Sequence, residues 1–172
     1  MDWQPQSPTD TGLVTPLSMF SSFPASSTAR LSAAFIIHSF PLPQPLNQEA
    51  TNLSYPELVF FVDSIICHAN LPNCVLFGVL CLLHCLGGMH LAGWSDHELF
   101  FIAFIVTSKI LCDDSYYNQE WCDEVACGLY ALEEINEMEK AFCRCMRWNL
   151  AIGQFNLDIF TVVVWTAFNA FI

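Results

Sequence analysis

The sequence contains very few basic residues. Only 5 lysines and arginines stand against 17 aspartates and glutamates in 172 residues, which gives a formal net charge of −12. Proteins that bind nucleic acid displace counterions from the phosphates with lysine and arginine, so this shortage argues against a nucleic-acid partner. Acidic membrane surfaces are disfavoured for the same reason. A partner protein with a basic or neutral face is compatible with the charge.

The chain also lacks the signals of secretion, disulfide bonding and metal binding. Its N-terminus, MDWQPQSPTDTG, has neither the basic start nor the apolar run of a signal peptide. Its 9 cysteines include no paired CxxC motif, which predicts free thiols in a reducing compartment, cytoplasmic and/or nuclear. Cys81, His84 and Cys85 come closest to a metal cluster, but no fourth ligand follows at a zinc-site spacing. We therefore expect no metal and no cofactor.

Signatures of the common enzyme classes are missing as well. The sequence contains no nucleophile elbow, phosphate-binding glycine loop, HExxH pair or dinucleotide fingerprint. The neighbouring acids Asp113 and Asp114 resemble a paired-carboxylate site, but a loop between two helices is a commoner setting for such acids. We expect a protein that is not an enzyme and binds no small-molecule ligand.

Apolar residues, by contrast, are abundant. Hydrophobic residues make up 54% of the chain and charged residues 13%, and the mean hydropathy is +0.43. Residues 74–94 contain no Asp, Glu, Lys or Arg and are long enough to span a bilayer, so a small integral membrane protein with a helix near 74–94 is the alternative to a globular fold. The interruption at Gly87-Gly88 and the absence of basic flanks favour a buried core helix and a turn, without a membrane.

Composition divides the chain near residue 50. Residues 1–50 carry seven of the 9 prolines and much of the serine and threonine, which predicts a mostly disordered leader. The short apolar patch 31–40 within it could dock on the folded part. Residues 51–172 are expected to form one domain.

Helical signals follow one another from Ser54 onward. Capping boxes at Ser54 with Glu57 and at Ser95 with Glu98 predict the starts of two helices, and Asn118 is placed to cap another. The helix after Ser95 is apolar nearly all round, which is typical of a central helix covered by its neighbours. No strand alternation persists, so the predicted class is all-α with five helices. The predicted helices span about 54–69, 73–86, 99–112, 118–127 and 132–147, followed by an apolar stretch, 155–172.

Two charged residues lie on otherwise apolar helix faces. Lys109 shares a face with Ile105, and Glu139 projects between Ile135 and Phe142. One interpretation is that both side chains lie near helix ends and extend to water. The other is that two helices pack side by side and present the pair together. The lysine would then bind carbonyls, and the glutamate N–H groups, at the exposed backbone end of a partner's helix. The periodicity leaves both interpretations open.

The residues around these charges resemble a known motif, the cyclin box. The resemblance is carried by Lys109-Ile-Leu-Cys-Asp113, Asn118, Trp121, Glu134-Ile-Asn-Glu-Met-Glu139, Phe142 and Trp148-Asn-Leu150. This run is most similar to that of the fungal Pcl-type and phosphate-regulating cyclins, and cyclin Y resembles it more distantly.

The resemblance implies a cyclin fold of five helices and a cyclin-dependent protein kinase as the partner. In the family, the matching lysine and glutamate hold the regulatory C-helix of the kinase, and these roles fall on Lys109 and Glu139. Further implied kinase contacts are Ile110, Asp113, Cys143 and Trp148. A cyclin performs no chemistry itself, and favours the active conformation of the kinase by binding that state preferentially.

The chain departs from the family pattern in several places. The basic residue usual before the third helix is missing from residues 93–97, and the Met-Arg-Ala-Ile-Leu signature of the substrate-docking groove is absent. There is no room for a second cyclin box, and the apolar end at 165–172 suggests a shortened or divergent member. A general transcription initiation factor with a cyclin fold is the rival, but it needs a basic DNA-facing surface, which the charge of −12 opposes.

Overall fold

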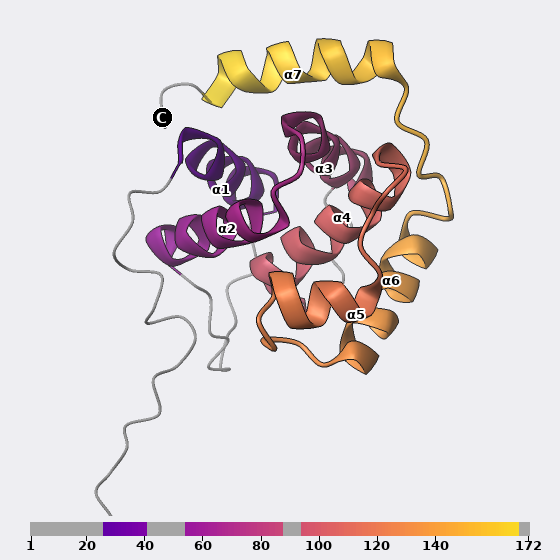
Figure 1. Ribbon diagram of the computed structural model, residues 1–172. Helices are drawn as coiled ribbons and strands as arrows, with labels where there is room; N and C mark the ends of the chain where they lie inside the picture. Colours follow the sequence, from indigo (N-terminus) through magenta and orange to yellow (C-terminus); the bar gives the residue numbers. More distant parts are fainter. Residues whose placement is uncertain (1–25, 41–53, 88–93, 169–172) are drawn as a thin grey trace, which may run out of the picture.

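The computed structural model describes residues 26–40, 54–87 and 94–168 of the chain. Within these ranges every regular element is helical (Figure 1), so the predicted all-α class is confirmed. The elements are α1 (Ser27–Ser39), α2 (Tyr55–Ala69), α3 (Asn73–Leu86), α4 (Asp96–Leu111), α5 (Asn118–Glu120), the π-helical turn η2 (Trp121–Val125), α6 (Leu132–Cys145) and α7 (Gln154–Phe168).

Both serine–glutamate signals begin helices as predicted. The carboxylate of Glu57 accepts a hydrogen bond from the Ser54 N–H at 2.6 Å at the start of α2. At the start of α4, Glu98 accepts one from the Ser95 N–H at 2.8 Å. These bonds occupy backbone donors that have no partner within the helix. α3 ends where Gly87 takes a φ of 63°, a left-handed conformation that costs glycine little.

α4 is the central helix of the bundle. It packs against α1, α2, α3 and α6, which surround it in Figure 1. Every residue from Leu99 to Ser108 is buried, and this explains why the helix has no polar face. α4 reaches the surface at Lys109, so the first exposed side chain after its buried stretch is a cation.

α3 and α4 approach each other closely at one glycine. A Cβ atom added to Gly78 would lie 2.7 Å from Cγ2 of Thr107 and 2.9 Å from Cδ1 of Leu111, both shorter than a normal contact. The absence of a side chain at Gly78 therefore sets the spacing between α3 and the half of α4 that leads to Lys109.

α1 lies within the predicted leader and contains most of the apolar patch 31–40 that was expected to be able to dock on the folded part. Residues 27–39 fall in the segment predicted to be mostly disordered, yet they form a helix in which Leu31 and Ile36 are fully buried. The Ser26 N–H also donates to Asp63 on α2 at 2.8 Å. The proline content of the leader does not predict this helix, because the prolines lie on either side of it. The last proline before the helix is Pro24, and the first one after it is Pro41. The other leader residues, 1–25 and 41–50, lie outside the described ranges.

The apolar run 74–94 does not form one long helix. α3 ends at Leu86, and residues 88–93 lie outside the described ranges. In the described part of the chain, no helix is long and apolar enough to cross a membrane.

α7 lies across the α1–α3 side of the bundle, along the top of Figure 1. Its Leu157 and Val164 are buried, and Phe35 of α1 makes edge contacts with Phe160 and Phe168 at centroid distances of 6.0 and 5.6 Å. The apolar stretch predicted at 155–172 is therefore helical through Phe168, and the last four residues lie outside the described ranges.

Candidate functional site

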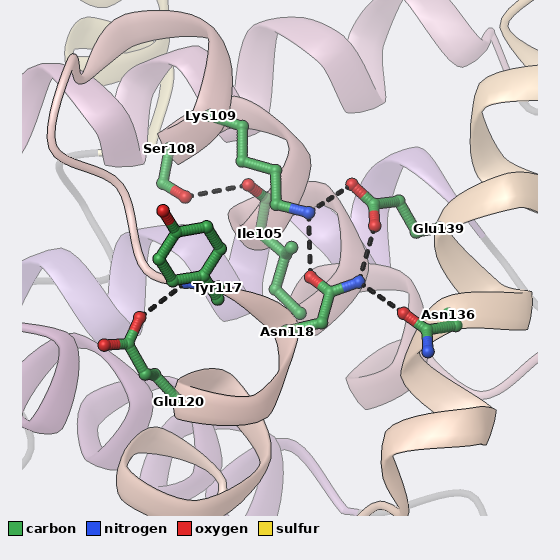
Figure 2. A network of polar contacts seen from close by, with 8 residues as sticks. All are labelled: Ile105, Ser108, Lys109, Tyr117, Asn118, Glu120, Asn136 and Glu139. Atoms are coloured by element: carbon green, nitrogen blue, oxygen red, sulfur yellow. Dashed lines mark hydrogen bonds and ion pairs between the residues drawn. The ribbon is translucent and has the colours of Figure 1, made fainter.

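Lys109 and Glu139 meet at the surface where the end of α4 lies against α6. The Nζ atom of Lys109 is 2.6 Å from Oε1 of Glu139 (Figure 2). The two side chains are 30% and 23% exposed, so each is largely covered and still reaches water. The structure thus favours the interpretation in which two neighbouring helices present these charges together.

Asn118 joins the two charges. Its Oδ1 accepts a hydrogen bond from Lys109 Nζ at 2.7 Å, and its Nδ2 donates to Glu139 Oε2 at 2.7 Å and to Asn136 Oδ1 at 2.8 Å (Figure 2). The prediction that Asn118 caps the helix is wrong, because Asn118 is the first residue of α5. Tyr117 occupies the cap position, where its N–H donates to Glu120 at 2.6 Å.

Trp121 anchors the segment that carries Asn118. Its ring is fully buried and makes edge contacts with Phe101 and Phe104 of α4, at centroid distances of 6.1 and 5.8 Å. Tyr116, on the other side of Asn118, contacts the same ring at 5.5 Å. A buried aromatic of this size dominates the local packing energy, so it fixes α5 against α4 and places Asn118 beside Lys109.

The pair retains hydrogen-bonding capacity. A lysine has three N–H donors, and Lys109 uses two of them on Glu139 and Asn118 within the described residues. Each oxygen of the Glu139 carboxylate accepts one hydrogen bond there and has a further lone pair. One donor and two acceptor positions therefore remain unused among the described residues, on side chains that reach water, which suits the unpaired backbone groups at the end of a partner's helix.

The other predicted contact residues lie at different depths. Ile110 is 37% exposed, and Asp113 is exposed in the turn after α4. Cys143 is buried one helical turn after Glu139, so it supports the pair from beneath and offers a partner almost no surface. Burial raises the pKa of the Cys143 thiol, Glu139 adds to this effect and Lys109 opposes it. The thiol therefore stays protonated at neutral pH.

Trp148 is held away from the protein by an unusual turn. Arg147 and Trp148 have φ values of 52° and 59°, a left-handed region that residues other than glycine rarely adopt. The Arg147 N–H donates to the Arg144 carbonyl and the Trp148 N–H to the Cys143 carbonyl, both at 2.9 Å. This is the Schellman pattern, with arginine where glycine usually stands. The residue after that position normally packs back on the helix, whereas Trp148 is 69% exposed.

Sequence reasoning missed two features of this region. Tyr117, which is 79% exposed, projects directly before Asn118, and Asn136 accepts one of the Asn118 hydrogen bonds. Asn136 belongs to the motif that carries the family resemblance, and its position three residues before Glu139 places both on one side of α6, but neither signal gave it a role at the site. Among the described residues, no group of three metal-ligating side chains occurs.

The surroundings of the pair contain more acids than bases. Lys109 is the only lysine or arginine between residues 31 and 139, and Lys140, Arg144 and Arg147 follow Glu139. The exposed acids in the neighbouring segments are Asp113, Asp114, Asp123, Glu124, Glu133, Glu134 and Glu137. A surface that complements this region has to be neutral or basic around the groups that contact Lys109.

Comparison with known proteins finds similarity to a yeast cyclin. PHO85 cyclin-1 of Saccharomyces cerevisiae is 25% identical to the chain over 120 residues, which cover 67% of this chain and 43% of that protein. The similarity supports a relationship with the cyclin family, and the all-α fold is consistent with it. The chain spans less than half the length of this relative. No protein-family model and no solved structure matches the chain.

Proposed function

We propose that the chain is a cyclin-like regulatory subunit that binds a cyclin-dependent protein kinase and favours its active conformation. One observation carries the proposal. Lys109 and Glu139, to which the family resemblance assigns the kinase-binding charges, are 30 residues apart in sequence and lie 2.6 Å apart at the surface. The role is regulatory, in the manner of the Pcl-type cyclins, and is exercised in the cytoplasm and/or nucleus.

The open positions on the pair define how it binds. The free N–H of Lys109 binds a backbone carbonyl of the kinase's regulatory helix, and the free lone pairs of Glu139 accept from backbone N–H groups. Hydrogen bonds to charged groups are stronger than those between neutral groups, so two of them fix the position of a helix end. Because these groups are in place only in the active arrangement of the kinase, binding shifts its population toward that arrangement.

Apolar side chains beside the pair complete the contact face. We assign Ile110 and Trp148 to this face as apolar contacts. Asp113 lies at the edge of the face, and the buried Cys143 packs below it. Tryptophan is one of the residue types enriched among the side chains that contribute most to binding at interfaces. When it packs on the kinase it excludes water from the neighbouring pair, and lower local dielectric strengthens the charged hydrogen bonds.

The proposal is tested by affinity purification of the tagged full chain from the cells that express it. We expect a cyclin-dependent kinase to be recovered with the wild-type chain and to be lost with Lys109→Ala/Glu139→Ala. Removing either member of a pair that is desolvated in an interface costs about 2–5 kcal/mol of binding. The double variant also removes every hydrogen bond from the pair to the kinase, so washing steps should reveal its loss.

A second ion pair on α6 supplies the matched control. Glu137 and Lys140 form an exposed pair at 2.8 Å, so Glu137→Ala/Lys140→Ala removes the same two charge types, both from the helix that carries Glu139. This control is expected to recover the kinase as the wild type does. Recovery of no kinase by the wild-type chain, or equal recovery by both double variants, contradicts the proposed function.

A further inference from the structure

We propose that Asn118 is a positioning residue for the kinase-binding pair, which keeps Lys109 and Glu139 adjacent but separately bonded so that each can also bind the kinase. This inference rests on the proposed function and concerns a residue outside the contacts assigned above. It is carried by the three hydrogen bonds of one side chain to three different residues on α4 and α6.

The bonds allow only one orientation of the Asn118 amide. Its oxygen faces the ammonium of Lys109, and both hydrogens of its nitrogen are used, on Glu139 and Asn136. A flipped amide would place its NH₂ group against the cation and its oxygen against two other oxygens. The amide dipole is therefore matched to the two charges, positive side to the carboxylate and negative side to the ammonium.

This arrangement limits how far the two charges satisfy each other. Asn118 occupies Oε2 of Glu139, and Lys109 contacts Oε1. Without the amide, the ammonium is free to move between both carboxylate oxygens and to use more of its donors on them. The donor and acceptor positions that the kinase backbone needs would then be spent within the pair.

The backbone of Asn118 is fixed from two sides, so its amide is a rigid reference point. Trp121 is buried three residues later, and the Tyr116 hydroxyl donates to the Ala69 carbonyl at 3.4 Å two residues before. Lysine and glutamate have long side chains that lose conformational freedom on binding. Holding both before the kinase arrives lowers the entropy cost of association.

The same turn contains an internal control. Gln119 follows Asn118 and is exposed, and its Nε2 donates to Asp123 at 2.7 Å. Gln119→Ala therefore removes an amide and one hydrogen bond from the same short helix. No hydrogen bond of Gln119 to the pair is present in the described residues.

The test measures dissociation constants of purified variants for the kinase that co-purifies with the wild-type chain. We expect Asn118→Ala to bind about tenfold more weakly, within the range for coupled neighbouring residues. Asn118→Asp, which has the same shape, is expected to bind more weakly still. It loses both donors, adds a negative charge beside Glu139 and attracts Lys109. Gln119→Ala is expected to stay within about twofold of wild type.

A second background separates positioning from direct contact with the kinase. In Lys109→Ala/Glu139→Ala there is nothing for Asn118 to position, so adding Asn118→Ala is expected to change the affinity by less than about twofold. A tenfold loss that persists in this background would mean that Asn118 itself touches the kinase, and it would overturn the inference. The inference would also be overturned if Asn118→Ala and Asn118→Asp each bound the kinase with wild-type affinity.

These outcomes are distinguishable from failure of the proposed function. If Lys109→Ala/Glu139→Ala weakens binding and neither Asn118 variant does, the proposed function stands and the positioning role is wrong. If the wild-type chain recovers no kinase, both are wrong. Thermal melting of each variant confirms that it is folded, and the isosteric Asn118→Asp carries the test if Asn118→Ala does not fold.

Discussion

Two residues next to the site bury polar atoms that have no hydrogen-bond partner among the described residues. These atoms are Oγ1 of Thr107, two residues before Lys109, and Nε1 of Trp121, which anchors α5. A buried polar group without a partner costs about 1–3 kcal/mol. Thr107 lies where α4 packs against Gly78 of α3, and Trp121 lies where η2 packs against Phe101 and Phe104 of α4. The segments that hold the Lys109–Glu139 pair are therefore folded at a local energetic cost.

Thr107→Val is expected to leave the stability unchanged or to raise it by about 1 kcal/mol, because it removes the unpaired hydroxyl and keeps the branched shape. Urea unfolding measures the change. The neighbouring Ser108→Ala serves as the comparison, since the Ser108 hydroxyl donates to the Ile105 carbonyl at 2.7 Å and its loss should destabilise by about 0.5–1.5 kcal/mol. A Thr107→Val protein clearly less stable than wild type would show that the hydroxyl has a partner.

The charged pair was predictable from sequence, whereas the residue that joins its members was not. Lys109 and Glu139 each break an apolar helix face, and a helical period is enough to detect such a misplaced charge. Asn118 lies in a short loop-like segment where asparagine is common, and its three partners come from α4 and α6. The sequence singles Asn118 out only as a cap candidate and as a motif residue, and its joining role depends on tertiary packing that local patterns do not show.

At the level of elements, the contact between α3 and α4 depends on Gly78. Gly78→Ala gains helix propensity of about 1 kcal/mol, but the new methyl group would overlap Thr107 and Leu111. Thr107 is β-branched and cannot rotate away easily. We expect a net destabilisation of about 1–3 kcal/mol by urea unfolding, the usual effect of overpacking a core.

Gly153→Ala provides the control for this substitution. A Cβ atom at Gly153 would lie 3.6 Å from Nδ2 of Asn156, an ordinary contact distance. Gly153 precedes α7 and its carbonyl accepts from the Leu157 N–H, a cap position where alanine is poorer than glycine, so a loss without any steric overlap is expected, smaller than that of Gly78→Ala. Equal stability of Gly78→Ala and Gly153→Ala would contradict the close approach of α3 and α4.

The contact between α2 and α4 includes a histidine that makes stability depend on pH. The ring of His97 lies edge-on to Phe61 at a centroid distance of 5.2 Å. Burial lowers the pKa of His97 below 6.5, while Glu98 and Glu57 partly oppose this shift. Near pH 6.5 the unfolded chain therefore binds more protons at this position than the folded one. Stability from this group is present above pH 6.5 and is lost as the pH falls toward the folded-state pKa.

His97→Gln is expected to show a smaller loss of melting temperature between pH 7.5 and about pH 5.5 than the wild type, because its side chain does not titrate. Asp96, whose pKa burial raises, is present in both proteins and cancels in the comparison. Melting curves followed by circular dichroism measure the difference. Parallel pH profiles for the two proteins would contradict the assigned effect of burial.

Element boundaries were largely predictable because caps and breakers are local signals. α3 begins and ends at the predicted residues, since Pro72 and Gly87 flank a continuous apolar run. α1 was predicted only as an apolar patch able to dock, because the sequence between the proline-rich segments does not show whether that patch is a helix of the core. Its packing against α2 and α7 in the structure shows that it is.

Across the whole molecule, most of the basic residues lie on or next to α6. Four of the 5 basic residues, Lys109, Lys140, Arg144 and Arg147, lie within residues 109–147, and Lys109 is the one that forms the pair with Glu139. The net charge of −12 makes the chain as a whole repel acidic partners. Net charge was readable from composition, but the placement of the pair at one surface required the packing of α4, α5 and α6.

The central claim is that Lys109 and Glu139 act together in binding a kinase, and a double-mutant cycle tests it most directly. Dissociation constants for the co-purified kinase are measured with the wild type, Lys109→Ala, Glu139→Ala and the double variant. We predict that each single variant loses nearly as much affinity as the double, so that the coupling energy is about as large as the loss in either single variant. Independent losses that simply add, or four equal dissociation constants, would contradict the claim.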